Sequence, residues 1–132
     1  MERVRLIIVD DDQAIRQGLR ALVEALGAEV LAEADNGRAC IEQAERLQPE
    51  LVLLDVSMPV MGGFPAARQL RARMPNLRII FVSQHRERIY IKEALEIGIN
   101  GYVWKQAAAT ELNDAIQTVM SGGSFVSPLA KL

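Results

Sequence analysis

The sequence of 132 residues has little cysteine, little aromatic content and no excess of one charge. Cys40 is the single cysteine, which excludes an internal disulfide and a disulfide-stabilised secreted fold. The 15 basic and 17 acidic residues give a formal charge of −2, so the chain has no general attraction for nucleic acid or for an anionic membrane. No apolar run approaches the roughly 20 residues of a membrane span, and we recognise no signal peptide. We therefore expect a cytoplasmic domain with no membrane contact.

Short apolar runs are spaced along the chain at residues 6–9, 51–54 and 79–82. Each is apolar at every position, which is typical of strands buried on both faces. Residues 30–35 alternate with polar side chains and indicate an edge strand, and residues 102–104 indicate a short fifth strand. The sequence thus predicts five strands.

Amphipathic stretches lie between these runs. Ile15, Leu19 and Val23 share one face of a first helix, which should end at Gly27. Gly18 within it lowers helix propensity, and we expect it to mark a close packing contact. Further helices are predicted at residues 39–47, 64–73, 87–97 and 110–120, the last with Thr110 as N-cap.

Strict alternation of strands and helices predicts an α/β fold, with a parallel sheet covered by helices on both faces. We adopt the strand order 2-1-3-4-5 from known doubly wound folds rather than deriving it. In such a sheet, ligands bind at the carboxyl ends of the central strands.

Chemically useful side chains follow four of the five predicted strands. Asp10 and Asp11 follow the first, Asp55 the third, Ser83 the fourth and Lys105 the fifth. The second strand, at the outside of the sheet, is followed only by what looks like a plain turn. Each residue alone would be read as a turn, cap or surface residue, and only their joint placement predicts a common cleft.

Charge balance indicates what this cleft binds. Three carboxylates within a few ångströms repel one another, and Lys105 offsets one charge. A divalent cation would offset the other two, and Mg²⁺ takes ligands from carboxylates, water and phosphates. We therefore predict a Mg²⁺-dependent phosphoryl-transfer site in which Asp55 is the nucleophile.

The residues in question form recognisable motifs. They are Val9-Asp10-Asp11-Asp12, Leu54-Asp55-Val56-Ser57-Met58-Pro59-Val60-Met61-Gly62-Gly63, Val82-Ser83 and Gly101-Tyr102-Val103-Trp104-Lys105. In this order they resemble the signature of response regulator receiver domains of two-component systems, over nearly the whole chain. The resemblance implies the five-stranded, flavodoxin-like fold of CheY and a phosphoacceptor domain that is not an enzyme in the usual sense, although slow self-dephosphorylation is expected.

The resemblance also implies roles for single residues. Asp10 and Asp11 would bind Mg²⁺ together with Asp55, the phosphoacceptor, and the backbone carbonyl of Ser57. Ser83 and Lys105 would contact the phosphoryl group, and Tyr102 would be the switch aromatic. Gly63 would be the turn glycine before the third helix.

Some positions depart from the family pattern or have ordinary explanations. Gln84 is bulky where many receivers have a small residue, so we expect narrower access to the site. Gln106 stands where many have proline, and we expect a trans bond before it. We expect His85 to be a surface loop residue, and Trp104 to serve packing or an interface.

The C-terminal part resembles the NarL/FixJ subgroup, whose receivers precede a LuxR-type helix-turn-helix domain. The cues are Thr110-Glu111-Leu112 and Gly122-Gly123-Ser124-Phe125-Val126-Ser127-Pro128. We expect residues 1–121 to be the receiver and residues 122–132 to be a loose tail, or the start of a linker to a missing DNA-binding domain.

The implied partners are a sensor histidine kinase and a second copy of the chain, with DNA bound only through the missing domain. Three alternatives stay open from the sequence. They are a stand-alone or hybrid-kinase receiver, a pseudo-receiver that binds without phosphorylation, and a metal-dependent hydrolase with Asp55 as nucleophile.

Overall fold

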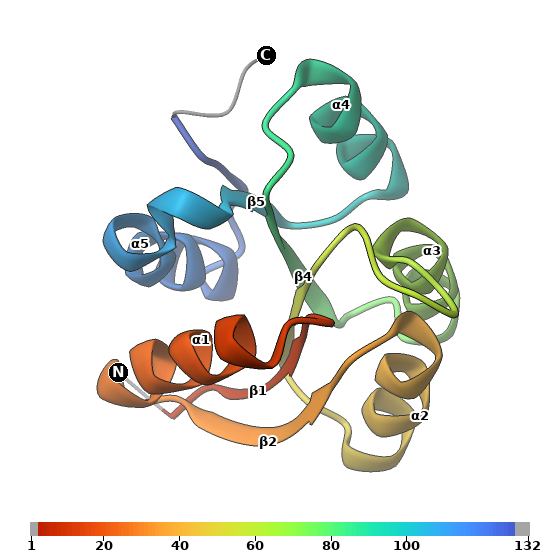
Figure 1. Ribbon diagram of the computed structural model, residues 1–132, viewed down its shortest axis with the longest axis horizontal. Coiled ribbons are helices and arrows are strands. Elements are labelled where there is room, and N and C mark those ends of the chain that lie inside the picture. The colour runs from red at the N-terminus through yellow and green to blue at the C-terminus, as the bar shows by residue number, and fades with distance from the viewer. Residues whose placement is uncertain (1–2, 129–132) are drawn as a thin grey trace.

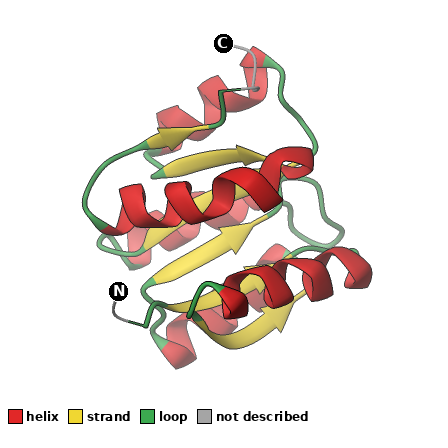
Figure 2. Ribbon diagram, turned by 90° about the vertical axis from the view of Figure 1, so that its left-hand side faces the viewer, coloured by secondary structure: helices red, strands yellow, loops and turns green. Residues whose placement is uncertain are grey.

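The computed structural model describes residues 3–128, which form a central sheet with helices on both faces (Figures 1 and 2). The sheet is parallel in every pairing and has the order β2-β1-β3-β4-β5-β6. Its strands are β1 (Arg5–Val9), β2 (Glu29–Ala34), β3 (Leu51–Leu54), β4 (Arg78–Ser83), β5 (Gly101–Trp104) and β6 (Phe125–Val126). The predicted order 2-1-3-4-5 is thus confirmed, and the expected edge strand does lie at an edge.

Five α-helices connect the strands and divide between the two faces. They are α1 (Gln13–Ala25), α2 (Gly37–Leu47), α3 (Gly63–Arg73), α4 (Arg88–Ile97) and α5 (Ala108–Met120). Figure 1 shows α1 and α5 on one side of the sheet and α2, α3 and α4 on the other. No helix of residues 3–128 has the length and apolar character that a membrane span requires.

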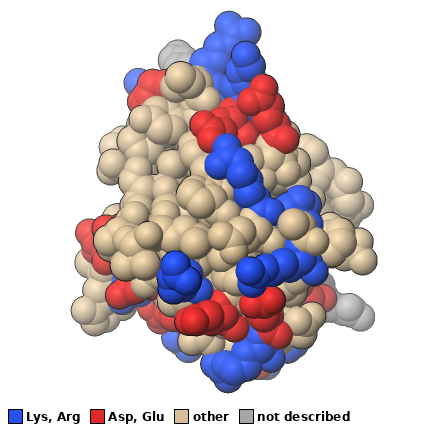
Figure 3. All heavy atoms as spheres, turned by 90° about the vertical axis from the view of Figure 1, so that its right-hand side faces the viewer, with Lys and Arg blue, Asp and Glu red and all other residues tan. Residues whose placement is uncertain are grey.

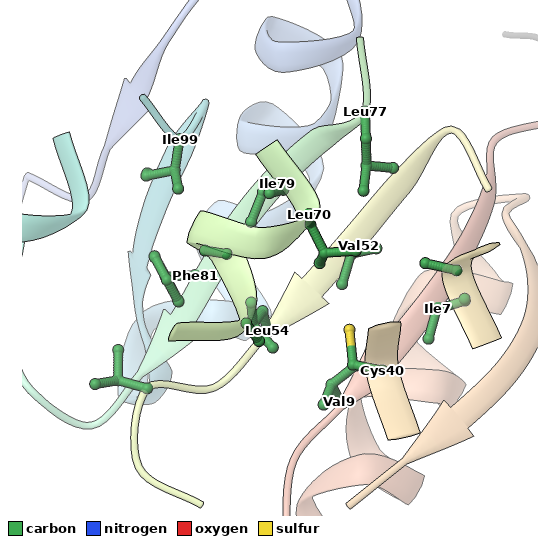
Figure 4. Packing of buried hydrophobic residues seen from close by; sticks show 14 of the residues in the cluster. Ile7, Val9, Cys40, Val52, Leu54, Leu70, Leu77, Ile79, Phe81 and Ile99 are labelled. Atoms are coloured by element: carbon green, nitrogen blue, oxygen red, sulfur yellow. The ribbon is translucent and has the colours of Figure 1, made fainter. Parts of the chain in front are cut away.

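Two apolar clusters, one on each face, explain why the central strands are apolar at every position. Ile7 and Val9 point to the side of α2, α3 and α4, whereas Leu6 and Ile8 point to the side of α1 and α5. Cys40 lies within the first cluster (Figure 4) and is fully buried. Burial raises the pKa of its thiol to about 12, as expected for an inert apolar filler.

Two details of the helices were predicted wrongly. Gly18 has no packing contact: a Cβ built there would meet nothing within 4 Å. Thr110 is not an N-cap, because α5 begins earlier, after a 3₁₀ turn at Lys105–Ala107, and the Thr110 hydroxyl donates to the Ala107 carbonyl. No peptide bond of residues 3–128 is cis, so the expectation for Gln106 is confirmed.

The end of the described chain is more ordered than expected. Phe125 and Val126 form β6, which pairs with Gly101 and Tyr102 of β5. Ser127 is buried, donates its N–H to the Tyr102 carbonyl at 2.8 Å and donates its hydroxyl to Glu111 of α5. The expectation of a loose tail from residue 122 was therefore wrong for this segment. Residues 129–132 lie outside the described residues, and the domain boundary at residue 121 stays a prediction.

Candidate functional site

Two neighbouring strands bring the acidic residues together. β1 and β3 pair in register with Val9 opposite Leu54, so the next residues, Asp10 and Asp55, leave the sheet side by side. The Asp55 N–H still donates to the Val9 carbonyl at 2.9 Å, which extends the ladder by one bond. Carboxylate oxygens of Asp10, Asp11 and Asp55 lie within 4.8 Å of one another. The predicted cluster is therefore present.

The three aspartates after β1 have different surroundings. Asp10 is 1% exposed, whereas Asp11 and Asp12 are exposed. Asp12 is the N-cap of α1, and its Oδ1 accepts from the N–H groups of Ala14 and Ile15. It is thus committed to the helix, which leaves Asp10 and Asp11 for the site.

Lys105 enters the same cluster from the end of β5. Its Nζ atom lies 2.7 Å from Asp10 Oδ2 and 3.4 Å from Asp55 Oδ2. Burial lowers the pKa of this ammonium, but its contacts with the two carboxylates more than offset the burial, and the pKa is raised overall. Lys105 therefore stays a cation in the site.

The pKa of Asp55 departs strongly from its ordinary value of 3.8. Its pKa is raised to about 6, first by burial and then by the charge of Asp10. Lys105 and the N–H of Val56, which donates to Asp55 Oδ1 at 2.8 Å, oppose this change without cancelling it. The positive charge near this carboxylate is therefore too small to offset its burial and the charge of Asp10.

The residues fit a hard divalent cation. The buried Asp10 Oδ2 pairs with Lys105 Nζ at 2.7 Å and has no other partner among the described residues. The Ser57 carbonyl accepts no hydrogen bond from residues 3–128. Carboxylate and carbonyl oxygens with spare lone pairs are the ligands that Mg²⁺ prefers. Asp10, Asp11, Asp55 and Ser57 could hold it here.

The predicted switch pair lies beside the acidic cluster, at the ends of β4 and β5. Ser83 and Tyr102 are both fully buried. The ring centroids of Tyr102 and Phe81 are 6.1 Å apart. The Tyr102 hydroxyl donates to the His85 carbonyl at 2.6 Å, and burial raises the pKa of this hydroxyl to about 12. Tyr102 is therefore not an exposed edge aromatic, while its role in switching stays a prediction.

His85 makes more contacts at the site than the sequence, which predicted a surface loop residue, indicated. It is partly buried, its Nε2 lies 3.0 Å from Ser57 Oγ, and its ring stacks on Tyr90 at 4.1 Å. Its N–H donates to Ser83 Oγ at 3.0 Å. The sequence shows that His85 follows Ser83 by two residues, but no spacing rule predicts a partner 28 residues away.

Two glycines fix the loop that follows Asp55. A Cβ on Gly63 would lie 2.0 Å from the Asp55 carbonyl oxygen, so this loop closes only on glycine. Gly63 is the first residue of α3 and not, as predicted, a turn residue before it. Gly37 lies where a plain turn was expected after the second strand, but it begins α2 and donates its N–H to the Met61 carbonyl at 2.7 Å. A Cβ there would lie 2.7 Å from the same oxygen.

Charged side chains of both signs lie on the face covered by α2, α3 and α4 (Figure 3). In Figure 3, acidic and basic side chains are interleaved over the face covered by α2, α3 and α4. Ion pairs on this face include Arg68 with Glu93 and Arg73 with Glu45.

Residues 6–117 match the family model described as response regulator receiver domain. The chain is 32% identical over 127 residues to the transcriptional regulatory protein DegU of Brevibacillus brevis, covering 96% of this chain and 54% of DegU. The chain thus spans about half the length of this relative.

Solved structures agree with the match. A LuxR-family two-component response regulator from Aurantimonas sp. SI85-9A1 is 31% identical, with a TM-score of 0.92 and coverage of 96% of this chain and 91% of that one. The signal receiver domain of the response regulator NarL from Mycobacterium tuberculosis is 32% identical, with a TM-score of 0.84 and coverage of 92% and 99%. The chain therefore belongs to the response regulator receiver domains of two-component systems, in their LuxR/NarL group.

Proposed function

We propose that this receiver accepts a phosphoryl group on Asp55 from a sensor histidine kinase, in a reaction that requires Mg²⁺. The observation that supports this most is the convergence of Asp10, Asp11, Asp55 and Lys105 at one edge of the sheet. The raised pKa of Asp55 agrees with a site completed by a cation, because Lys105 alone does not offset its burial and the charge of Asp10.

The transfer is a displacement at phosphorus. An oxygen of the Asp55 carboxylate forms the new P–O bond while the P–N bond to the donor imidazole breaks, and the electron pair of that bond returns to the imidazole nitrogen. Lys105 neutralises charge on the phosphoryl oxygens, and it already lies in the site before the donor arrives. Asp10, Asp11 and the Ser57 carbonyl would hold Mg²⁺, which supplies further charge neutralisation when it is bound.

The switch would begin at Ser83. Its hydroxyl accepts from the His85 N–H in this structure, and a phosphoryl group on Asp55 would compete for it. The Tyr102 hydroxyl already bonds the His85 carbonyl, so the turn after β4 is tied to β5. Phosphorylation would bias the surface of α4, β5 and α5 between two existing arrangements.

The output would be control of transcription by a longer protein. DegU is named a transcriptional regulatory protein, and it is nearly twice as long as the part that matches this chain. We propose that a DNA-binding domain follows the receiver beyond residues 122–132, that DNA is bound only through it, and that two receivers can associate. Such a regulator would act in the cytoplasm.

The test is phosphorylation by a small donor. Purified protein is incubated with acetyl phosphate and MgCl₂ and weighed by mass spectrometry. We expect a gain of one phosphoryl group that requires Mg²⁺ and disappears in Asp55→Asn, but persists in Asp35→Asn, a matched change in the exposed turn after β2. A gain that survives in Asp55→Asn contradicts the proposal, and no gain in any variant would favour a pseudo-receiver.

A further inference from the structure

We propose that His85 is a positioning residue for the Mg²⁺ site, and that it acts through Ser57. This inference rests on the proposed Mg²⁺-dependent function, but it concerns an imidazole side chain to which that function gives no role. The observation that supports it is a hydrogen bond between two loops that meet at the site: His85 Nε2 lies 3.0 Å from Ser57 Oγ.

Ser57 needs a support because its surroundings provide little. It is exposed, it lies in the loop between β3 and α3, and its carbonyl is free to bind a cation. The ends of the loop are fixed by the bond from the Gly63 N–H to the Val56 carbonyl and by the contact of Gly37 with Met61. Among the described residues, His85 is the one hydrogen-bond partner of Ser57. Anchoring the side chain limits rotation of the backbone that carries the carbonyl.

His85 is suited to this task because it is held on three other sides. Its ring stacks on Tyr90 of α4 with a centroid distance of 4.1 Å and an interplanar angle of 10°. Its N–H donates to Ser83 Oγ, and its carbonyl accepts from the Tyr102 hydroxyl. Its imidazole is therefore a fixed partner, and the loop of Ser57 is the element that it positions.

The same contacts link the metal site to the proposed switch. Movement of Ser83 toward a phosphoryl group would release the His85 N–H, and a shift of His85 would move Ser57. Since coupling between two binding events is reciprocal, Mg²⁺ would then favour one arrangement of the turn after β4. Metal ligands are commonly oriented by groups that do not touch the metal, and loss of such a group weakens metal affinity about 10- to 100-fold.

A double-mutant cycle on metal affinity tests the inference without any measurement of phosphorylation. Mn²⁺ serves as the probe because free Mn²⁺ can be counted by electron paramagnetic resonance, and Mg²⁺ is measured by competition. We expect His85→Ala and Ser57→Ala each to weaken binding about 10-fold, at the lower end of that range because Ser57 is exposed. The double variant should bind as weakly as either single one, because both changes break the same contact.

Two further variants serve as controls. His85→Gln keeps a side-chain donor and should recover much of the lost affinity. Arg86→Ala alters the neighbouring residue, whose guanidinium lies over Trp104 rather than on Ser57, and should leave affinity unchanged. Thermal unfolding of each metal-free variant checks that the fold is retained.

The outcomes separate the two proposals. Unmutated protein that binds no Mn²⁺ would count against the proposed Mg²⁺-dependent function. Metal binding with unchanged affinity in His85→Ala, or with independent effects of the two changes that multiply in the double variant, would overturn only the positioning role of His85.

Discussion

Lys105 lies closer to Asp10 than to Asp55: its Nζ atom is 2.7 Å from the first carboxylate and 3.4 Å from the second. The lysine therefore neutralises the residue that is not the proposed phosphoacceptor more fully than the one that is. Asp55 keeps a pKa of about 6, raised first by burial and then by Asp10.

Asp55 should make the stability of the metal-free protein depend on pH. Its folded pKa of about 6 lies above the ordinary 3.8, so its contribution to stability is fully present below about pH 4 and is lost as the pH rises through 6. Asp55→Asn has no such loss and should gain up to about 3 kcal/mol relative to the unmutated chain between pH 4 and pH 7. Urea denaturation with a chelator measures the difference, and Asp35→Asn should show none of it. A stability difference between Asp55→Asn and the unmutated chain that shrinks toward neutral pH would contradict the assigned pKa.

Lys105→Gln should separate metal binding from phosphoryl transfer. The variant loses the cation that would neutralise the phosphoryl oxygens, so phosphorylation by acetyl phosphate should slow by about 100-fold. Metal affinity should be kept or improved, because a competing positive charge has left Asp10. The rate is measured by quenching the reaction at a series of times and weighing the protein by mass spectrometry. Lys92→Gln on the exposed face of α4 is the matched control. Equal rates in the two variants would remove Lys105 from the mechanism.

Gly63→Ala should destabilise the domain severely. The new Cβ would lie 2.0 Å from the Asp55 carbonyl oxygen, and backbone rather than a flexible side chain must move. We expect a loss of about 2–4 kcal/mol, within the upper range for single substitutions. Gly18→Ala is the matched change in open space on α1 and should instead stabilise by about 1 kcal/mol. Chemical denaturation of both variants checks the pair, and similar effects at the two glycines would refute it.

Val60 should be a source of strain in the loop after Asp55. It has a φ of +66° and its side chain is 76% exposed, so a β-branched residue adopts a left-handed conformation without a packing contact that offsets the strain. Val60→Asn should stabilise the protein by about 1 kcal/mol, because asparagine tolerates this conformation. Val60→Thr keeps the branched Cβ and should not. A melting temperature that rises equally in both variants would point to a cause other than backbone strain.

The fold and the acidic cluster could be predicted because both follow from rules of sequence order. Unbroken apolar runs mark strands buried on two faces, and a parallel sheet carries every strand's carboxyl end to one edge. Asp10 and Asp55 therefore had to meet once β1 and β3 were neighbours. The strand order itself was adopted from known folds, and the family motifs supported it.

The features that were missed depend on contacts between distant residues. β6 contains only two residues after a glycine-rich turn, and its pairing with β5 gives no periodic signal. Ser57 and His85 are 28 residues apart, and only the three-dimensional path of two loops brings them together. Gly18 shows the reverse error, since a glycine in a helix need not mark a contact.

The most direct test of the account is a crystal structure of the chain with MgCl₂ and beryllofluoride, an analogue of the phosphoryl group. We predict beryllium bonded to an Asp55 carboxylate oxygen and Mg²⁺ bound by the acidic pair after β1 and by the Ser57 carbonyl. Lys105 should then contact a fluorine atom. A structure with an unmodified Asp55, or with metal bound away from these residues, would contradict the central claim.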